Sequence, residues 1–197
     1  MIGSKTNHCL FCKISSENTH KIYQTKNFYL ITDGAPLGSG HLLLIPKEHL
    51  SCFGALSEKF NEEFSLLQKK VISFLEDNFG RTILFEHGVF GQTVHHAHLH
   101  FLPTEKKVLP FAQKKYEIKK IKSFWTLKDV LKKDKGYLFF QEDKSNYIIK
   151  IKNPPAGFFH TYLLTELLGV PADFDKRAKK AKNVYLQAEL LWKDTEN

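Results

Sequence analysis

The stretch Val94-His95-His96-Ala97-His98-Leu99-His100-Phe101-Leu102 places three histidines at two-residue spacing inside an apolar, strand-like run. Successive side chains of a β-strand point to opposite faces of the sheet, so His96, His98 and His100 are predicted to share one face. The intervening apolar residues then share the other face. The pattern therefore predicts a strand with a histidine face toward a pocket and an apolar face toward the core.

Two chemistries would use such a histidine face. Two imidazoles at H-x-H spacing can bind one Zn²⁺, and an imidazole can attack phosphorus while its neighbours orient it and manage protons. Three histidines that fall in register by chance on a solvated edge are the third possibility, although His is not among the residues enriched in strands. The isolated histidines His20, His87 and His160 are expected to be ordinary surface or half-buried residues.

Residues 91–100, Gly-Gln-Thr-Val-His-His-Ala-His-Leu-His, resemble the signature of the histidine triad (HIT) family. That signature is Gly-Gln-Ser/Thr-Val, any residue, and then His-φ-His-φ-His-φ-φ with φ apolar. Three further blocks stand in the family's order: the Cys-x-x-Cys block at 9–14, Asp33, and the block at 40–50, whose Gly-His-x-Leu-x-Ile-Pro-Lys-x-His pattern ends at His49. The resemblance covers residues 9–102, which is about half of the chain.

The resemblance implies an α+β fold, with an antiparallel HIT-like sheet and a long helix, and a nucleotidyl hydrolase or transferase. The substrate would be a nucleoside phosphate substituted at its α-phosphorus, of the dinucleoside polyphosphate or phosphoramidate class. His98 would attack that phosphorus and form a nucleotidyl-histidine, which water or a second acceptor resolves. The other implied roles are His100 near the phosphate, His96 flanking the nucleophile or binding metal, His41 hydrogen-bonding within the cluster, Gln92 and Thr93 on phosphate oxygens or the leaving group, Asp33 on the ribose hydroxyls, and Leu10, Phe11 and Ile31 around the base.

The chemistry of the residues supports these roles. A neutral imidazole with an ordinary pKa near 6.5 is a competent nucleophile at pH 7. Phosphoryl transfer otherwise needs positioning and charge stabilisation, which Gln92, Thr93 and backbone amides can supply. One position departs from the better-known branches of the family, which carry Asn or Gln thirteen residues before the nucleophile, because this chain has Phe85 there.

The Cys9-x-x-Cys12 pair is the second chemical signal. By itself such a pair indicates a metal half-site, a redox pair or two free core cysteines. Zinc-containing branches of the family complete a tetrahedral set with one upstream histidine and the first histidine of the triad. By that resemblance Cys9, Cys12, His49 and His96 would hold a structural Zn²⁺, and Cys52 would be buried filler.

Periodicity predicts the remaining elements of the first half. Strands are expected over residues 20–24, 28–32, 41–45 and 82–86, with Pro46 stopping the third. Apolar residues at helical spacing from Phe60 to Leu75 predict one long helix, capped at Ser57 and ended before Gly80. Pro103 and Pro110 are expected to close this catalytic unit, which we place at residues 1–104.

Residues 105–197 are predicted to form a basic α+β accessory region packed on that unit. Its expected elements are a helix capped at Thr126, a hairpin of residues 137–141 and 147–152, a helix over 158–168 ended by Gly169 and Pro171, and a last helix from about Asp173 whose Val184, Leu186, Leu190, Leu191 and Trp192 dock. This half carries 20 basic and 12 acidic residues, whereas residues 1–104 carry nine of each, so it holds the whole net charge of +8.

The basic half permits two interpretations. Clustered lysines concentrate phosphate ligands and would suit nucleic acid, but no nucleic-acid-binding motif accompanies them, so a solvated face is favoured. No apolar run reaches membrane-spanning length, which predicts a soluble, cytoplasmic protein without membrane contact. Homodimerisation is common in the family, but no residue pattern indicates it here. The alternative to an enzyme is a zinc-containing nucleotide- or RNA-binding module with little turnover.

Overall fold

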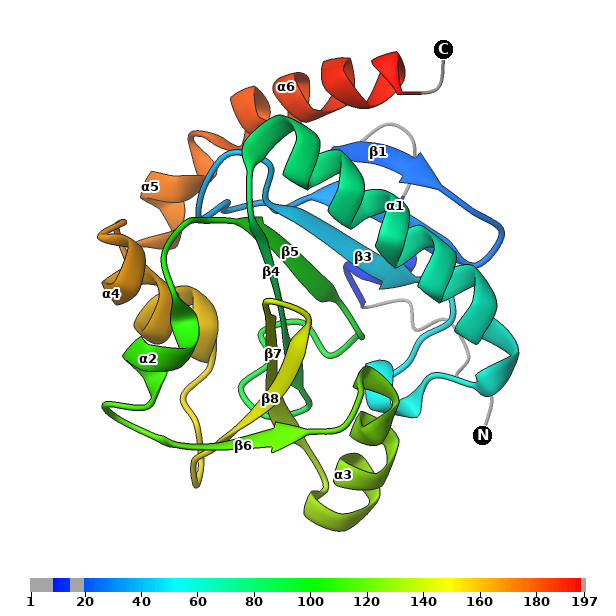
Figure 1. Ribbon diagram of the computed structural model, residues 1–197. Coiled ribbons are helices and arrows are strands. Elements are labelled where there is room, and N and C mark those ends of the chain that lie inside the picture. Colours follow the sequence, from blue (N-terminus) through cyan, green and yellow to red (C-terminus); the bar gives the residue numbers. More distant parts are fainter. Residues whose placement is uncertain (1–8, 15–19, 196–197) are drawn as a thin grey trace.

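One curved sheet of eight strands, each paired antiparallel with its neighbours, forms the framework of the chain (Figure 1). The computed structural model describes residues 9–14 and 20–195. The strand order is β1-β2-β3-β5-β4-β7-β8-β6. The strands are β1 (Lys21–Gln24), β2 (Phe28–Thr32), β3 (Leu42–Pro46), β4 (Thr82–Gly88), β5 (Leu99–Pro103), β6 (Glu117–Ile121), β7 (Tyr137–Glu142) and β8 (Ser145–Lys150). The predicted α+β fold with an antiparallel sheet is confirmed.

The strand predicted around the three histidines starts later than expected, because β5 begins at Leu99. The N–H of His96 donates to the carbonyl of Val94 (2.8 Å), and the N–H of Ala97 donates to the carbonyl of Leu50 (2.7 Å). The first bond makes a local turn, and the second holds the segment before β5 against the loop after β3 instead of in the sheet. His100 is therefore the only one of the three triad histidines that lies within β5.

One face of the sheet is covered by α1 (Asn61–Phe79), the predicted long helix (Figure 1). Its buried residues meet apolar side chains of β2, β3, β5 and β7, and Trp192 of α6 (Ala181–Asp194) joins the same cluster. Ser57 does not cap α1 but precedes a short 3₁₀ turn, η3 (Glu58–Phe60), without a side-chain capping bond. The remaining helices on this side are η2 (Phe53–Ala55), η4 (Phe124–Thr126) and α3 (Leu127–Asp134).

The opposite face is covered by η1 (Phe11–Lys13) at one end and by η5 (Phe158–Leu163) at the other. η5 has π-helical hydrogen bonding and continues as α4 (Leu164–Leu168), so the helix predicted over 158–168 is confirmed. It packs beside α2 (Val108–Ala112) over β4, β7 and β8. The space left between these two coverings contains the candidate site.

The second half of the chain extends the same sheet, because β7 pairs with β4 along five residue pairs, including Phe85 with Phe140. The sheet is continuous across the predicted division at residue 104, and that division stays a prediction. The β7–β8 hairpin is confirmed, but its turn is only two residues long, Asp143 and Lys144, both with positive φ. β6 was not predicted, since its sequence Glu-Ile-Lys-Lys-Ile lacks a clear apolar alternation.

The last predicted helix is two helices, α5 (Phe174–Ala178) and α6. Asp173 caps α5, because its side chain accepts a hydrogen bond from the N–H of Lys176 (3.0 Å). Val184 and Trp192 dock as predicted, but the prediction is wrong for Leu186 and Leu190, which are 49% and 65% exposed.

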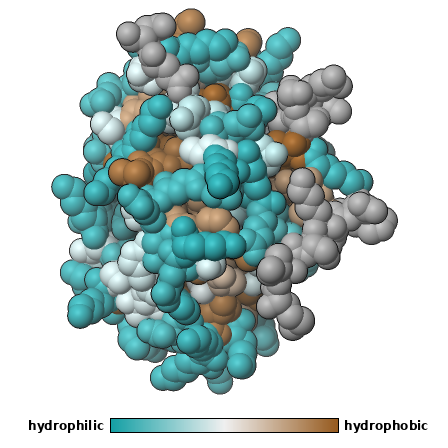
Figure 2. Space-filling view, turned by 90° about the vertical axis from the view of Figure 1, so that its right-hand side faces the viewer, coloured by the Kyte–Doolittle hydropathy of each residue, from teal (hydrophilic) through white to brown (hydrophobic). Residues whose placement is uncertain are grey.

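Among the described residues no helix is both long enough and apolar enough to cross a membrane. The face in Figure 2 is largely hydrophilic and carries hydrophobic side chains in small patches. Residues 1–8, whose sequence contains no apolar run, lie outside the described part.

Candidate active site

A cavity of about 700 Å³ opens between η1 and η5, over the face of the sheet that carries His100. The first half of the chain lines it with apolar residues, with Asp33 and with His98 and His100, and the second half adds a wall of its own. That wall consists of Gly157, His160, Thr161, Phe174 and Arg177. Both halves of the chain therefore build one cavity.

His98 is oriented by the backbone immediately before it. Its Nδ1 lies 2.6 Å from the carbonyl oxygen of His96, and because a carbonyl only accepts, Nδ1 must carry the proton. The lone pair is then on Nε2. Burial lowers the pKa of His98 below its ordinary value, so the ring is neutral at pH 7 and Nε2 is available as a nucleophile.

A chain of hydrogen bonds sets the proton positions on His41 and His100. The N–H of Leu37 donates to Nδ1 of His41 (3.0 Å), so the proton of a neutral His41 lies on Nε2. The Nε2–H of His41 in turn donates to Nδ1 of His100 (3.1 Å). His100 consequently carries its proton on Nε2, an atom that is buried and has no partner among the described residues. The site thus presents one buried N–H donor with an unused hydrogen bond.

Burial keeps both of these rings neutral. It lowers the pKa of His41 to about 3 and that of His100 well below the ordinary range. Phe85, at the position where the family pattern differs, stacks on His100 with ring centroids 4.2 Å apart and planes 9° apart. The phenyl ring therefore fixes the plane of His100 without offering it a hydrogen bond.

Asp33 contacts the histidine cluster through one oxygen. Its Oδ1 accepts the N–H of Ala35 (2.7 Å), and its Oδ2 lies 3.3 Å from Nε2 of His160. Although burial alone would raise the pKa of Asp33, the nearby rings of His160 and His41 lower it below the ordinary value. Asp33 is therefore a buried carboxylate at neutral pH.

The expectation of a surface or half-buried position is wrong for His87. His160 is half-buried, as expected, but it contacts Asp33. His87 is buried, and its Nε2 accepts the N–H of Phe159 (3.1 Å), which fastens η5 to β4. Its place two residues after Phe85 on β4, the same period as the triad, could have revealed it. No local signal could have revealed His160, because η5 brings it to the site from a distant part of the chain. His20 lines the cavity and stacks on Tyr185 at 4.9 Å.

The structure brings most of the predicted substrate-contacting residues to this cavity. Leu10, Phe11, Ile31 and Thr93 line it, and Leu10 is 67% exposed at its surface. Gln92 is placed differently, because it is buried and its Nε2 donates to the carbonyl of Ser51 (2.7 Å). The predicted roles of these residues stay predictions.

The four predicted metal ligands, Cys9, Cys12, His49 and His96, form one cluster with donor atoms within 4.8 Å of one another. The sulfur–Nδ1 distances are 3.4 Å for Cys9–His96, 3.2 Å for Cys12–His49 and 3.6 Å for Cys12–His96. A tetrahedral Zn²⁺ with ordinary bond lengths separates a sulfur and a nitrogen ligand by about 3.6 Å. Moreover, Nε2 of His96 donates to the carbonyl of Pro46 (2.8 Å), which leaves the Nδ1 lone pair for a metal. The donor set fits Zn²⁺.

A second group, Asp33, His41, His100 and His160, also has donor atoms within 4.8 Å. The hydrogen bonds disfavour a metal there. Since Leu37 donates to Nδ1 of His41, the Nε2 that faces the group carries a proton and has no lone pair to give. This group is better described as alternating hydrogen-bond donors and acceptors.

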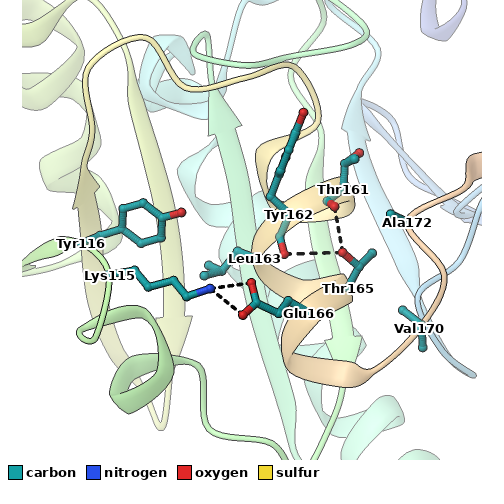
Figure 3. Close-up of a pocket in the computed structure, with 9 residues that line it drawn as sticks. All are labelled: Lys115, Tyr116, Thr161, Tyr162, Leu163, Thr165, Glu166, Val170 and Ala172. Carbon is teal, nitrogen blue, oxygen red and sulfur yellow. Dashed lines mark hydrogen bonds and ion pairs between the residues drawn. The ribbon is translucent and has the colours of Figure 1, made fainter.

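A smaller pocket of about 410 Å³ lies behind η5 and is shown in Figure 3. Lys115 there forms an ion pair with Glu166 of α4, and the hydroxyl of Thr165 donates to the carbonyl of Thr161 (2.9 Å). These bonds hold η5 and α4 in place, and no histidine lines this pocket, so it supports the site but contains none of its chemistry.

Comparison with known proteins finds three kinds of similarity. A family model described as HIT domain matches residues 15–107. An uncharacterized HIT-like protein of Mycoplasma genitalium is 32% identical over 109 residues, which are 52% of this chain and 77% of that protein. An adenosine 5′-monophosphoramidase of Saccharomyces cerevisiae is 28% identical over 97 residues, 48% of this chain and 61% of that protein. The solved structure of a HIT family protein from Bacillus anthracis aligns with 49% of this chain and with 73% of that protein, at 28% identity and a TM-score of 0.45.

Proposed function

Because this chain belongs to the histidine triad (HIT) family, we propose that it is a nucleotidyl hydrolase acting at the α-phosphorus of a nucleoside phosphate derivative. The observation that carries the proposal is the proton arrangement of two rings in one cavity. His98 has its lone pair on Nε2, and His100 has an unused Nε2–H donor. A nucleophile beside a donor for a phosphoryl oxygen is what covalent catalysis at phosphorus requires.

The reaction would take two steps. Nε2 of His98 bonds to the α-phosphorus as the leaving group departs, while the Nε2–H of His100 stabilises the charge that develops on a phosphoryl oxygen. Water then releases the nucleoside monophosphate. The similarity to an adenosine 5′-monophosphoramidase supports a phosphoramidate-class substrate, and a dinucleoside polyphosphate is the other member of the proposed class.

The nucleotide itself would occupy the apolar part of the cavity. Phe11 and Ile31, with Leu10 at the mouth, offer contacts for a base, and Asp33 offers a carboxylate to ribose hydroxyls. Oδ2 of Asp33 would then be shared with His160, and a carboxylate oxygen has a second lone pair for that purpose.

Zinc would be held by Cys9, Cys12, His49 and His96, whose donor distances fit a tetrahedral ion. When bound there it would supply structure, tying the N-terminal segment to the loop after β3 and to a residue two positions before His98. The carbonyl that orients His98 belongs to His96, so this cluster would also stabilise the nucleophile's position.

The test is turnover of adenosine 5′-monophosphoramidate and diadenosine tri- and tetraphosphate by the wild type and by His98→Ala, with His95→Ala as the matched control because His95 is exposed. We expect the His98 variant to lose at least about 10³-fold in kcat while the control stays near wild type. Mass spectrometry of enzyme quenched and digested at alkaline pH, where a phosphorus–nitrogen bond survives, should find one nucleotidyl group on the peptide that contains His98. Binding of the nucleotides without turnover by the wild type would contradict the hydrolase and favour a nucleotide-binding module.

A further inference from the structure

His160 is the one titratable side chain that the second half of the chain places in direct contact with the histidine cluster, among the residues that the structure describes. We propose that His160, supported by the carboxylate of Asp33, is the general acid–base that protonates the leaving group and then activates water. This inference rests on the proposed function and adds to it a residue outside the matched family region, residues 15–107.

The contact between Asp33 and His160 has the arrangement of an acid–base dyad. Nε2 of His160 lies 3.3 Å from Oδ2 of Asp33 and 3.4 Å from Nδ1 of His100. Neither of those atoms has a proton to give, because Oδ2 belongs to a carboxylate and Nδ1 of His100 already accepts the Nε2–H of His41, so Nε2 of His160 must donate, and Asp33 is its acceptor. Nδ1 is then the ring nitrogen left for proton transfer, and it has no hydrogen-bond partner among the described residues. His160 itself lines the cavity and is half-buried.

The position of His160 relative to the nucleophile suits proton transfer. The ring of His100 contacts both other rings, with centroids 5.0 Å from His98 and 4.9 Å from His160. The nucleophile and the carboxylate-supported imidazole therefore both pack against the ring that is proposed to bond the phosphoryl group. Attacking and leaving atoms in phosphoryl transfer lie roughly in line on either side of phosphorus, so such a group needs chemistry on both sides.

The fold holds His160 firmly for this task. η5 starts after Gly157, which has a φ of 67° in the left-handed region, and its Phe158 and Phe159 are buried. The N–H of Phe159 is bonded to His87, and the Thr165–Thr161 bond stabilises the next turn (Figure 3). Such π-helical turns occur frequently at functional sites, and here the turn presents one imidazole to Asp33.

Each proton and electron pair that moves in the first step of the reaction is returned in the second. As Nε2 of His98 bonds to phosphorus, the bond to the leaving atom breaks with its electron pair, and that atom takes the proton from Nδ1 of an imidazolium at His160. In the second step water gives a proton to that nitrogen while its oxygen bonds to phosphorus. The phosphorus–nitrogen bond breaks, its electron pair returns to His98, and His160 is again an imidazolium beside the Asp33 carboxylate.

The test compares two adenylates whose leaving groups differ in their need for a proton. Adenosine 5′-monophosphoramidate must protonate its leaving amine, whereas the 4-nitrophenyl ester of AMP releases a stable anion. We would measure kcat/KM, which reports the steps through departure of the leaving group, for the wild type, His160→Ala and His160→Gln. The control is Tyr162→Ala, a change at a 48% exposed residue of the same helix.

General acid catalysis contributes about 10²–10⁴-fold. We therefore expect both His160 variants to lose that factor on the phosphoramidate and less than tenfold on the nitrophenyl ester, with the control near wild type. Equal losses on both compounds, or no loss on either, overturn the role of His160 while wild-type turnover upholds the proposed function. Absence of any monophosphate from the wild type with either compound overturns both. The glutamine variant keeps a polar side chain at the site, so normal folding of that variant rules out collapse as the cause.

Discussion

Replacing Glu86 with glutamine should remove a large part of the pH dependence of stability. Glu86 lies on β4 and is fully buried under the sheet face that packs on η2. Its Oε1 accepts the N–H of Phe53 (2.7 Å), and its Oε2 accepts the hydroxyl of Tyr137 (2.6 Å). Burial raises the pKa of Glu86 to about 7, and these two hydrogen bonds only partly oppose the rise.

The sign follows from proton binding. Between the ordinary glutamate pKa of 4.5 and about 7, the folded state holds a proton that the unfolded state has lost. The free energy of unfolding therefore falls as pH rises through this window. The difference of about 2.5 pH units corresponds to about 3 kcal/mol. A glutamine has no such proton to lose, and its amide can still donate to Tyr137 and accept from Phe53.

The assay is chemical denaturation of both proteins at several pH values from 4.5 to 8. The stability of Glu86→Gln relative to the wild type should rise by about 3 kcal/mol across this range. Taking the difference between the two proteins cancels the titration of all other groups. Glu76→Gln, on the exposed side of α1, controls for the loss of one surface carboxylate. A difference that stays constant with pH within about 0.5 kcal/mol would refute the reasoning.

Two further predictions concern the N-terminal segment and α6. Cys9→Ser and Cys12→Ser should each reduce bound zinc by about one ion per chain, as measured by elemental mass spectrometry, and should lower the thermal midpoint of unfolding in calorimetry. Cys52→Ala is the control. Equal metal content in all three variants would contradict the proposed cluster. Trp192→Ala should cost about 3–5 kcal/mol in chemical denaturation, because this fully buried ring packs on Phe74 at 4.8 Å and docks α6 on the sheet, whereas Leu190→Ala, at an exposed position of the same helix, should cost less than about 0.5 kcal/mol.

Much of the first half of the chain was predictable because its signals are local. β2 was predicted residue for residue, and α1 followed from apolar spacing. The family resemblance also grouped the four cysteine and histidine residues of the proposed zinc cluster, whose donor atoms lie together in the structure. The start of β5 was not predictable, because the bond from Ala97 to Leu50 that displaces the preceding residues from the sheet joins segments 47 positions apart.

The second half shows where local signals end. Its hairpin and helices could be predicted from turn residues and periodicity, but their attachment could not, since pairing between β7 and β4 depends on a register that no single strand encodes. Once β7 pairs there, the two halves share one sheet. η5 must then cover the apolar residues of β4, which include Phe85.

This covering explains why Phe85 and His160 belong to one arrangement. Phe85 stands where the better-known branches of the family carry Asn or Gln, and its ring stacks on His100 and packs on Phe159 at 5.0 Å. The residue after Phe159 is His160, which the helix directs to Asp33. Phe85 on β4 thus provides part of the surface on which η5 docks. Because η5 docks there, His160 lies in the cavity beside Asp33. A polar residue at position 85 would need a partner of its own under η5, so the phenyl ring of Phe85 and the placement of His160 beside Asp33 are linked through the docking of η5.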